Sequence, residues 1–450
     1  MTASNKPKLK PHVVACTAPF HGHFLPVLNI VYRLVDRGYD VSFVTGSEFK
    51  DCVEEAGASF YSIPSFDLEA FKKERTMCNG FEAKVAFSSY TMCIQPRKER
   101  KIALYAALEQ VRERHPDREV VILTETFFLG DHALYLGAEL PRGFTRRPRS
   151  VSIHTMPYMV SSQVTAPLGL GYIPDGTEEG RRYCASEWAR FKRDVYQKTM
   201  VYQEKNFREM GAVHVPSNEP PQNVMGTSAD VTLQMCPPSL EYDLPDYHPR
   251  MRFAGALAGI GLSRDFQYPS FWPDVTRRDR KVVAVTQGTV AVNHRDLLIP
   301  TLKALASRSD LVVVAILGKR GASLPADVTI PSNAHVIDYL PYQAILPYAS
   351  VFVSNGGYGG FIQGMLFRVP MILAGTTEDK LEVACRGEYA GIAINLRTDT
   401  PEVDRITQAV DEVLRDDRYK RRITEIWQEN GNMKTMDIIE GEILKYANEV

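Results

Sequence analysis

A run of six residues, Asn355–Gly360, contains four glycines and is the segment with the clearest chemical potential. It follows an apolar strand predicted over Ser350–Ser354 and precedes a helix predicted over Phe361–Phe367. Glycine lets the backbone approach a ligand without any Cβ in the way, and free amides at a helix N-terminus bind phosphate well. The segment therefore indicates a site for a phosphorylated small molecule, although a glycine cluster alone is also compatible with a plain turn.

A second turn of this kind lies earlier in the chain, at Gln287–Thr289. Val282–Thr286 is predicted as a buried strand, and a helix is predicted from Arg295 onward. Thr289 offers a hydroxyl and an amide to a phosphate. We expect the two turns to feed one crevice.

The first half of the chain places two histidines just after an apolar strand predicted over His12–Ala18. His21 and His23 precede a helix predicted from Leu25 to about Asp36, and ligands bind outside the carboxyl ends of strands in open α/β sheets. An imidazole can take the proton from an attacking hydroxyl. A loop histidine that only caps the helix is the alternative, and it applies more strongly to His21.

A catalytic histidine needs a carboxylate to hold its tautomer and stabilise the imidazolium. Glu125 follows the strand predicted over Glu119–Thr124 and is the candidate. Asp131 is the rival, and its other interpretation is an acid that stabilises a helix N-terminus.

These segments resemble the nucleotide-sugar glycosyltransferases of the GT-B fold, specifically the UDP-dependent enzymes that glycosylate small lipophilic molecules. Plant members carry W-A-P-Q, then H-C-G-W-N-S, a Glu and D-Q, and the spacing here is the same although many letters differ. The variant NGGYGG followed by EDK is similar to the microbial branch, which includes macrolide and sterol glycosyltransferases. The matching positions are Tyr339, Leu340, Pro341 and Tyr342; Asn355, Gly357, Tyr358, Gly359 and Gly360; Gln363; and Asp379 and Lys380.

The resemblance implies roles for these positions in binding a UDP-sugar. Tyr339 would stack on the base, Asn355 and Thr289 would contact phosphate, and Gln363 would bind the ribose. Asp379 would bind sugar hydroxyls, with His23 as catalytic base and Glu125 as its partner. Ordinary structural roles compete for two of them: Tyr339 as a core aromatic and Asp379 as a helix N-cap.

The activity implied is that of an inverting, metal-independent glycosyltransferase. It would move a hexose, most consistently glucose, from a UDP-sugar to a hydroxyl of a lipophilic phenolic, polyketide, macrolide or sterol. The UDP-sugar is the donor substrate, and no cofactor is expected. An isomerase or phosphorylase on the same fold, and a non-catalytic partner protein that keeps the fold, remain alternatives.

Composition excludes several other classes. The net charge of the 450 residues is -1, which implies no nucleic-acid partner. Seven cysteines without C-x-x-C spacing suggest neither a zinc site nor a disulfide framework. No apolar run of eighteen residues occurs, so stable membrane insertion is not expected. We expect a cytoplasmic monomer or weak dimer.

Strand and helix patterns alternate twice along the chain, which predicts an α/β protein with parallel sheets and crossover helices. The resemblance implies the GT-B fold, in which two Rossmann-like domains have parallel sheets that face a central cleft. The predicted divisions are residues 1–249 for the acceptor, 250–425 for the nucleotide sugar, and 426–450 for a helix that returns to the first domain. The proline-rich stretch Cys236–Pro249 is the predicted linker. Aromatic and methionine residues between Pro64 and Arg97, and in the helical stretch Tyr183–Phe207, are candidates to line an acceptor site.

Overall fold

The structure is a computed structural model that describes residues 9–263, 265–288 and 293–449, and within these residues it contains two parallel β-sheets. The first has the order β3-β2-β1-β4-β5-β6-β7 and the second the order β10-β9-β8-β11-β12-β13. The first sheet consists of β1 (His12–Cys16), β2 (Val41–Gly46), β3 (Ser59–Ile63), β4 (Val120–Glu125), β5 (Arg149–His154), β6 (Val231–Gln234) and β7 (Met251–Phe253). The second consists of β8 (Lys281–Thr286), β9 (Leu311–Ile316), β10 (Ala334–Ile337), β11 (Ala349–Ser354), β12 (Met371–Leu373) and β13 (Ala393–Asn395).

Helices cover both faces of each sheet, which is why the central strands are apolar without alternation. Along β1, Val13 and Ala15 pack in one hydrophobic cluster, and Val14 and Cys16 pack in another on the opposite face. The helices of the first half are α1 (His21–Asp36), α2 (Lys50–Glu55), α3 (Leu68–Thr76), α4 (Gly80–Cys93), α5 (Arg97–Arg114), α6 (His132–Tyr135), α7 (Glu178–Asp194), α8 (Gln197–Glu209) and α9 (Pro221–Thr227).

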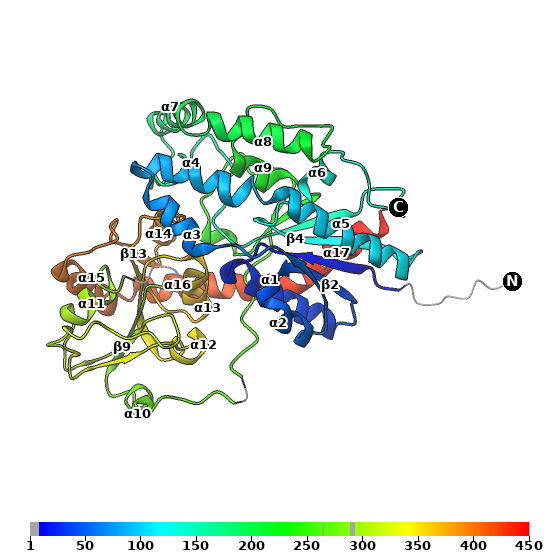
Figure 1. Cartoon of the computed structure of the whole chain (residues 1–450). Coiled ribbons are helices and arrows are strands. Elements are labelled where there is room, and N and C mark those ends of the chain that lie inside the picture. The colour runs from blue at the N-terminus through cyan, green and yellow to red at the C-terminus, as the bar shows by residue number, and fades with distance from the viewer. Residues whose placement is uncertain (1–8, 264, 289–292, 450) are drawn as a thin grey trace.

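The helices of the second half are α10 (Trp272–Thr276), α11 (Leu298–Ala304), α12 (Tyr342–Ile345), α13 (Tyr358–Leu366), α14 (Lys380–Tyr389), α15 (Val403–Arg415), α16 (Arg418–Asn432) and α17 (Thr435–Asn448). Short 3-10 turns occupy Ser47–Phe49 and Pro238–Leu240. Figure 1 shows the two halves side by side, with α3 and α4 over the junction.

The C-terminal helices divide between the two cores. Ile423 and Ile426 of α16 pack in the core of the second half, whereas Ile439 and Ile443 of α17 pack against the first sheet. The chain therefore crosses near Lys434, the left-handed residue that separates α16 from α17, and not at residue 426. In Figure 1 the red α17 lies with the first sheet, apart from the second.

The structure places β7 and the proline-rich stretch differently from the predicted division at residue 249. Strand β7 adds Met251–Phe253 to the first sheet, beyond the predicted boundary at residue 249. The stretch Cys236–Pro249 is no free linker, because Leu240 packs in the second core and Tyr242 packs near Cys385 of α14. Leu240, Tyr242 and Leu244 of this stretch are buried, and the connection between the halves follows β7.

Candidate functional site

The two halves contribute facing groups to one site. His23 belongs to the first turn of α1, which begins at His21 and not at Leu25 as predicted, so both histidines lie on the helix. Pro26 lies inside this helix, in its second turn, and so does not mark where the helix begins. Glu125 is the last residue of β4, the strand next to β1.

His23 and Glu125 form a close pair. His23 Nδ1 lies 2.7 Å from Glu125 Oε1, with the histidine side chain 21% exposed and the carboxylate fully buried. Glu125 also accepts hydrogen bonds from the amide of Phe127 (3.1 Å) and the hydroxyl of Thr155 (3.3 Å). With Nδ1 donating to the carboxylate, Nε2 is left as the free base.

The charges around His23 raise its pKa. Burial alone would lower the pKa, but the charge and hydrogen bond of Glu125 and the charge of Asp379 outweigh it. Asp379 comes from the second half of the chain, just before α14, so the imidazole faces the opposite domain. The imidazole of His23 therefore interacts with carboxylates from both halves of the chain.

Asp131, the rival carboxylate, lies elsewhere. Its Oδ1 accepts a hydrogen bond from Thr124 Oγ1 at 3.1 Å, and its other oxygen has no partner among the described residues. Burial raises the pKa of Asp131 to about 7. Asp131 is thus a buried side chain behind β4, and the geometry favours Glu125 as the partner of His23.

The glycine turn joins β11 to α13 and is tied to the end of β8. Asn355 Nδ2 donates to the backbone oxygen of Gln287 at 2.5 Å, so the amide expected to contact phosphate instead links the two turns. Gly356 has a φ of +81°, and a Cβ there would lie 3.1 Å from the backbone oxygen of Lys380. Thr289, expected to complete this site, lies outside the described residues.

The first turn of α13 leaves one side open. Gly357 is extended with a φ of -62°, and a Cβ at Gly359 would meet nothing within 4 Å. One turn further, Gln363 Oε1 is buried and has no hydrogen-bond partner among the described residues. An unpaired buried oxygen of Gln363 fits the expected hydrogen bond from a ligand hydroxyl.

Several predicted ligand contacts are structural side chains in this arrangement. Tyr358 is buried, and its hydroxyl accepts a hydrogen bond from Gln234 Nε2 on β6 of the other half. Leu340 packs in the core of the second half, and Tyr342 packs edge-on against Phe352. Leu340 is buried and Tyr342 is partly buried in this core, and the ligand contacts expected of these residues stay predictions.

Tyr339 follows β10 and is 38% exposed, as a stacking surface requires. The guanidinium of Arg320 lies 4.7 Å from its ring centre. Arg320 and Lys319 line a hollow of about 440 Å³ at the carboxyl ends of β8 and β9. These cations were missed by motif reasoning because they belong to a loop without a recognisable pattern.

The acidic loop before α14 is held by charges from both halves. Lys380 Nζ pairs with Glu378 and donates to Thr377 Oγ1 at 3.0 Å, so it neutralises its own loop. Glu378 has a φ of +50° and also binds Arg75 of α3, at 3.1 Å. Asp379 does not use its side chain as a helix cap, which leaves the carboxylate for a ligand.

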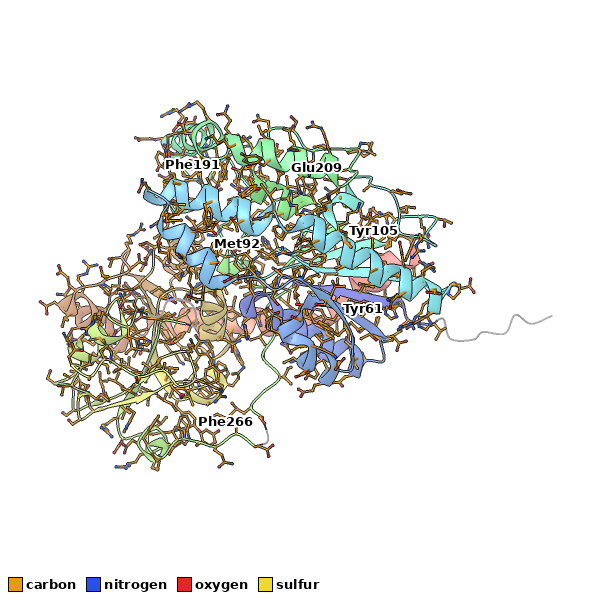
Figure 2. All side chains as sticks on the ribbon, viewed as in Figure 1. Tyr61, Met92, Tyr105, Phe191, Glu209 and Phe266 are labelled. Carbon is orange, nitrogen blue, oxygen red and sulfur yellow. The ribbon has the colours of Figure 1, made fainter. Side chains whose placement is uncertain are left out.

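Aromatic rings line the first-half side of the site. Phe127 lies 4.7 Å and Phe20 lies 5.8 Å from the ring of His23, measured between ring centres. From Phe20 the contacts continue to Phe66 at 4.9 Å and then to Phe71 at 5.4 Å. Figure 2 labels Met92 on α4, the helix that lies over the junction. These half-buried side chains form an apolar wall beside the base.

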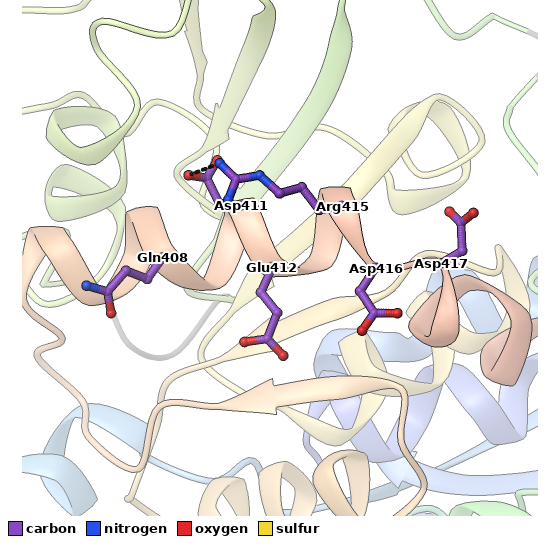
Figure 3. A pocket seen from close by; sticks show the side chains of 6 residues that line it. All are labelled: Gln408, Asp411, Glu412, Arg415, Asp416 and Asp417. Carbon is purple, nitrogen blue, oxygen red and sulfur yellow. Dashed lines mark hydrogen bonds and ion pairs between the residues drawn. The ribbon is translucent and has the colours of Figure 1, made fainter.

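A larger hollow, of about 610 Å³, lies on α15 and the start of α16 (Figure 3). Its acids would repel a diphosphate, so it is not a nucleotide site. The part of the chain that the structure describes contains no group of His, Cys, Asp and Glu arranged to hold a metal ion, and no helix there is long and apolar enough to cross a membrane. Residues lining this hollow are Gln408, Asp411, Glu412, Arg415, Asp416 and Asp417.

Comparison with known proteins finds relatives along nearly the whole chain. UDP-glucosyltransferase 1 of Beauveria bassiana is 48% identical over 438 residues, covering 97% of this chain and 95% of the relative. UDP-glucosyltransferase B1 of Starmerella bombicola is 36% identical, covering 98% and 99%. Residues 301–438 match the family model of the erythromycin biosynthesis protein CIII-like C-terminal domain.

Solved structures show the same architecture. The kitacinnamycin glycosyltransferase aligns with a TM-score of 0.70 at 20% identity, over 98% of this chain and all of that one. The calicheamicin glycosyltransferase aligns with a TM-score of 0.69 at 19% identity, over 98% of this chain and 99% of that one. The GT-B fold expected from the sequence, with two Rossmann-like halves, is confirmed.

Proposed function

We propose that this chain, which belongs to the UDP-dependent glycosyltransferase family, transfers glucose from UDP-glucose to a hydroxyl of a lipophilic small molecule with inversion at the anomeric carbon. Support for glucose comes from the names of the two fungal relatives with 48% and 36% identity. The apolar wall of Phe20, Phe66 and Phe127 beside His23 supports a lipophilic acceptor.

The reaction follows from the site geometry. His23 Nε2 takes the proton of the acceptor hydroxyl as the oxygen attacks the anomeric carbon, and the bond from that carbon to the diphosphate oxygen breaks. The positive charge that forms on His23 is stabilised by Glu125, 2.7 Å from Nδ1. The diphosphate leaves against the amides at the start of α13, next to the glycine turn. Asp379 accepts from the sugar hydroxyls.

One observation carries this proposal: the buried His23–Glu125 pair of the first half faces Asp379 at the edge of the glycine-turn half. His23, Glu125 and the loop that carries Asp379 thus come together from the two halves of the chain. A phosphorylase would need phosphate in place of the acceptor, and the apolar wall at this position is a poor binding surface for an anion.

The test is turnover of UDP-glucose with a panel of phenols and other lipophilic alcohols, followed by mass shift and UDP release. His23→Ala should lower transfer by about 10²-fold or more while UDP binding measured by calorimetry stays near wild type. His21→Ala is the matched control, since its ring packs on Phe49 at 4.9 Å. Greater damage from His21→Ala would contradict the assignment of the base.

The setting of the enzyme is part of the same proposal. A cytoplasmic setting fits a chain in which all seven cysteines are free, and a monomer or weak dimer stays part of the proposal. No cofactor beyond the donor substrate is required by the chemistry described.

A further inference from the structure

Arg100 on α5 is a buried arginine whose guanidinium binds main-chain oxygens. Its Nη1 donates to the carbonyl oxygen of Phe127 at 2.5 Å and approaches that of Phe128 at 3.3 Å. The side chain is 2% exposed, and burial lowers its pKa to about 10. The desolvation of this cation is offset by the two carbonyl oxygens and by the charge of Glu125.

The segment that Arg100 holds is the turn Phe127–Gly130, directly after Glu125. Leu129 adopts a φ of 59°, in the left-handed region that is costly for a residue with a Cβ. A Cβ on Gly130 would lie 2.7 Å from the backbone of Arg100, so the turn packs tightly on α5. Strained turns of this kind persist only where their surroundings fix them.

Through Phe127 the same turn reaches the catalytic pair. The amide of Phe127 donates to Glu125 Oε2 at 3.1 Å, and its ring lies 4.7 Å from the ring of His23. Arg100 therefore binds the carbonyl oxygen of Phe127, and the amide of the same residue binds the carboxylate of Glu125.

We propose that Arg100 is a positioning residue for the His23–Glu125 pair: its guanidinium fixes the Phe127–Gly130 turn, and through that turn the place of the Glu125 carboxylate. The proposal rests on His23 acting as the base. It assigns a function to a helix that contributes no group to the reacting atoms, and neither motif spacing nor the family resemblance points to it.

The charge of Arg100 also affects the base. The charged and titratable groups that face His23 are Glu125 on β4, Asp379 before α14, Arg100 on α5 and His154 on β5. Glu125 and Asp379 raise the pKa of His23, and Arg100 lowers it. Removal of the Arg100 charge should therefore raise the pKa of His23 and move the acidic limb of the rate profile to higher pH.

The experiment compares Arg100→Met, Arg100→Gln and Arg100→Lys with Arg97→Met. Arg97 is the matched control, because it is a fully buried arginine on the same helix that hydrogen-bonds Gln203 at 2.9 Å instead of the turn. Two readouts are used: the pH profile of kcat/KM for the acceptor, and the titration of His23 followed by ¹⁵N NMR without substrate.

Arg100→Met should lower kcat by about tenfold to a hundredfold and move the His23 titration upward, because the turn is displaced and the charge is lost. Arg100→Gln, which keeps a donor for the turn, should show the same titration shift with a smaller loss of kcat. Arg100→Lys and Arg97→Met should titrate like wild type.

Identical His23 titrations in Arg100→Gln and wild type, together with no greater loss of kcat than in Arg97→Met, would overturn the proposal. Should Arg100→Met fail to fold, the Gln and Lys variants carry the comparison. A wild-type protein without UDP-glucose turnover would refute the proposed function and would leave the NMR comparison of the variants valid.

Discussion

Glu125 is the residue on which the proposed mechanism most depends, because its carboxylate lies 2.7 Å from His23 Nδ1 and would fix the tautomer of the proposed base. The sequence identified both members of this pair from their places after two apolar strands. It could not decide between Glu125 and Asp131, since that choice depends on which side chain points toward the cleft. The side-chain contacts distinguish the two: Glu125 lies 2.7 Å from His23, whereas Asp131 accepts a hydrogen bond from Thr124.

Glu125→Gln should lower transfer strongly with little change in acceptor binding, because an amide can hold the ring but cannot balance its charge. Since Glu125 raises the pKa of His23, the acidic limb of kcat/KM should also move to lower pH in this variant. A pH series of initial rates measures both effects. Glu125→Asp should stay active, and a Gln variant with wild-type kcat would exclude this residue as the partner.

Asp131→Asn is the matched control, and its effect should appear in stability instead of rate. The folded pKa of Asp131, about 7, lies above the ordinary value of 3.8, so its contribution to the free energy of unfolding is fully present below pH 3.8 and is lost as pH rises toward 7. Asparagine does not ionise. The free energy of unfolding of the variant should therefore rise relative to that of wild type as pH increases across this range, and denaturant unfolding at several pH values measures it. Loss of transfer in Asp131→Asn would instead make Asp131 the partner of His23.

At the scale of elements, the periodic patterns predicted most strands, because parallel strands buried on both faces are continuous apolar runs. Strand β7 was missed, since Met251–Phe253 is short and follows a proline. Helix α1 starts earlier than predicted because a helix can begin before a proline in its second turn. The glycine turn lies between β11 and α13, as predicted, and its residue in the left-handed conformation is Gly356, with a φ of +81°.

Gly356→Ala should weaken UDP binding and destabilise the fold. At a φ of +81° alanine is strained, and its Cβ would press on the backbone oxygen of Lys380 at 3.1 Å. Calorimetry with UDP and thermal unfolding measure the two effects. Gly441→Ala on α17, where a Cβ would meet nothing within 4 Å, is the control. Equal UDP binding and thermal unfolding of the two variants would contradict the need for glycine at position 356.

At the scale of the whole molecule, a buried ionic cluster joins the two halves, and no sequence motif predicted it. Arg386 of α14 pairs with Glu241, lies 3.6 Å from Glu382, and donates to the backbone oxygen of Tyr158 at 2.7 Å. Burial alone would lower the pKa of Arg386, but the two carboxylates hold it above its ordinary value. Such contacts join distant segments, so sequence periodicity cannot predict them.

Arg386→Met should destabilise the protein by about 3–5 kcal/mol, because it leaves two buried carboxylates without their cation. Denaturant unfolding at pH 7 measures the loss. The matched surface pair Arg142–Glu109 provides the control, and Arg142→Met should change stability little. A small effect of Arg386→Met would mean that the two halves are held mainly by apolar packing.

The proposed reaction is tested most directly by determining the anomeric configuration of the product made from UDP-glucose, using proton NMR. Direct attack by the acceptor oxygen deprotonated by His23 passes through no covalent enzyme intermediate, so the product should be the β-glucoside of the acceptor, formed together with one UDP per turnover and strongly reduced in His23→Ala. An α-glucoside, release of glucose 1-phosphate in place of a glucoside, or unimpaired transfer by His23→Ala would contradict it.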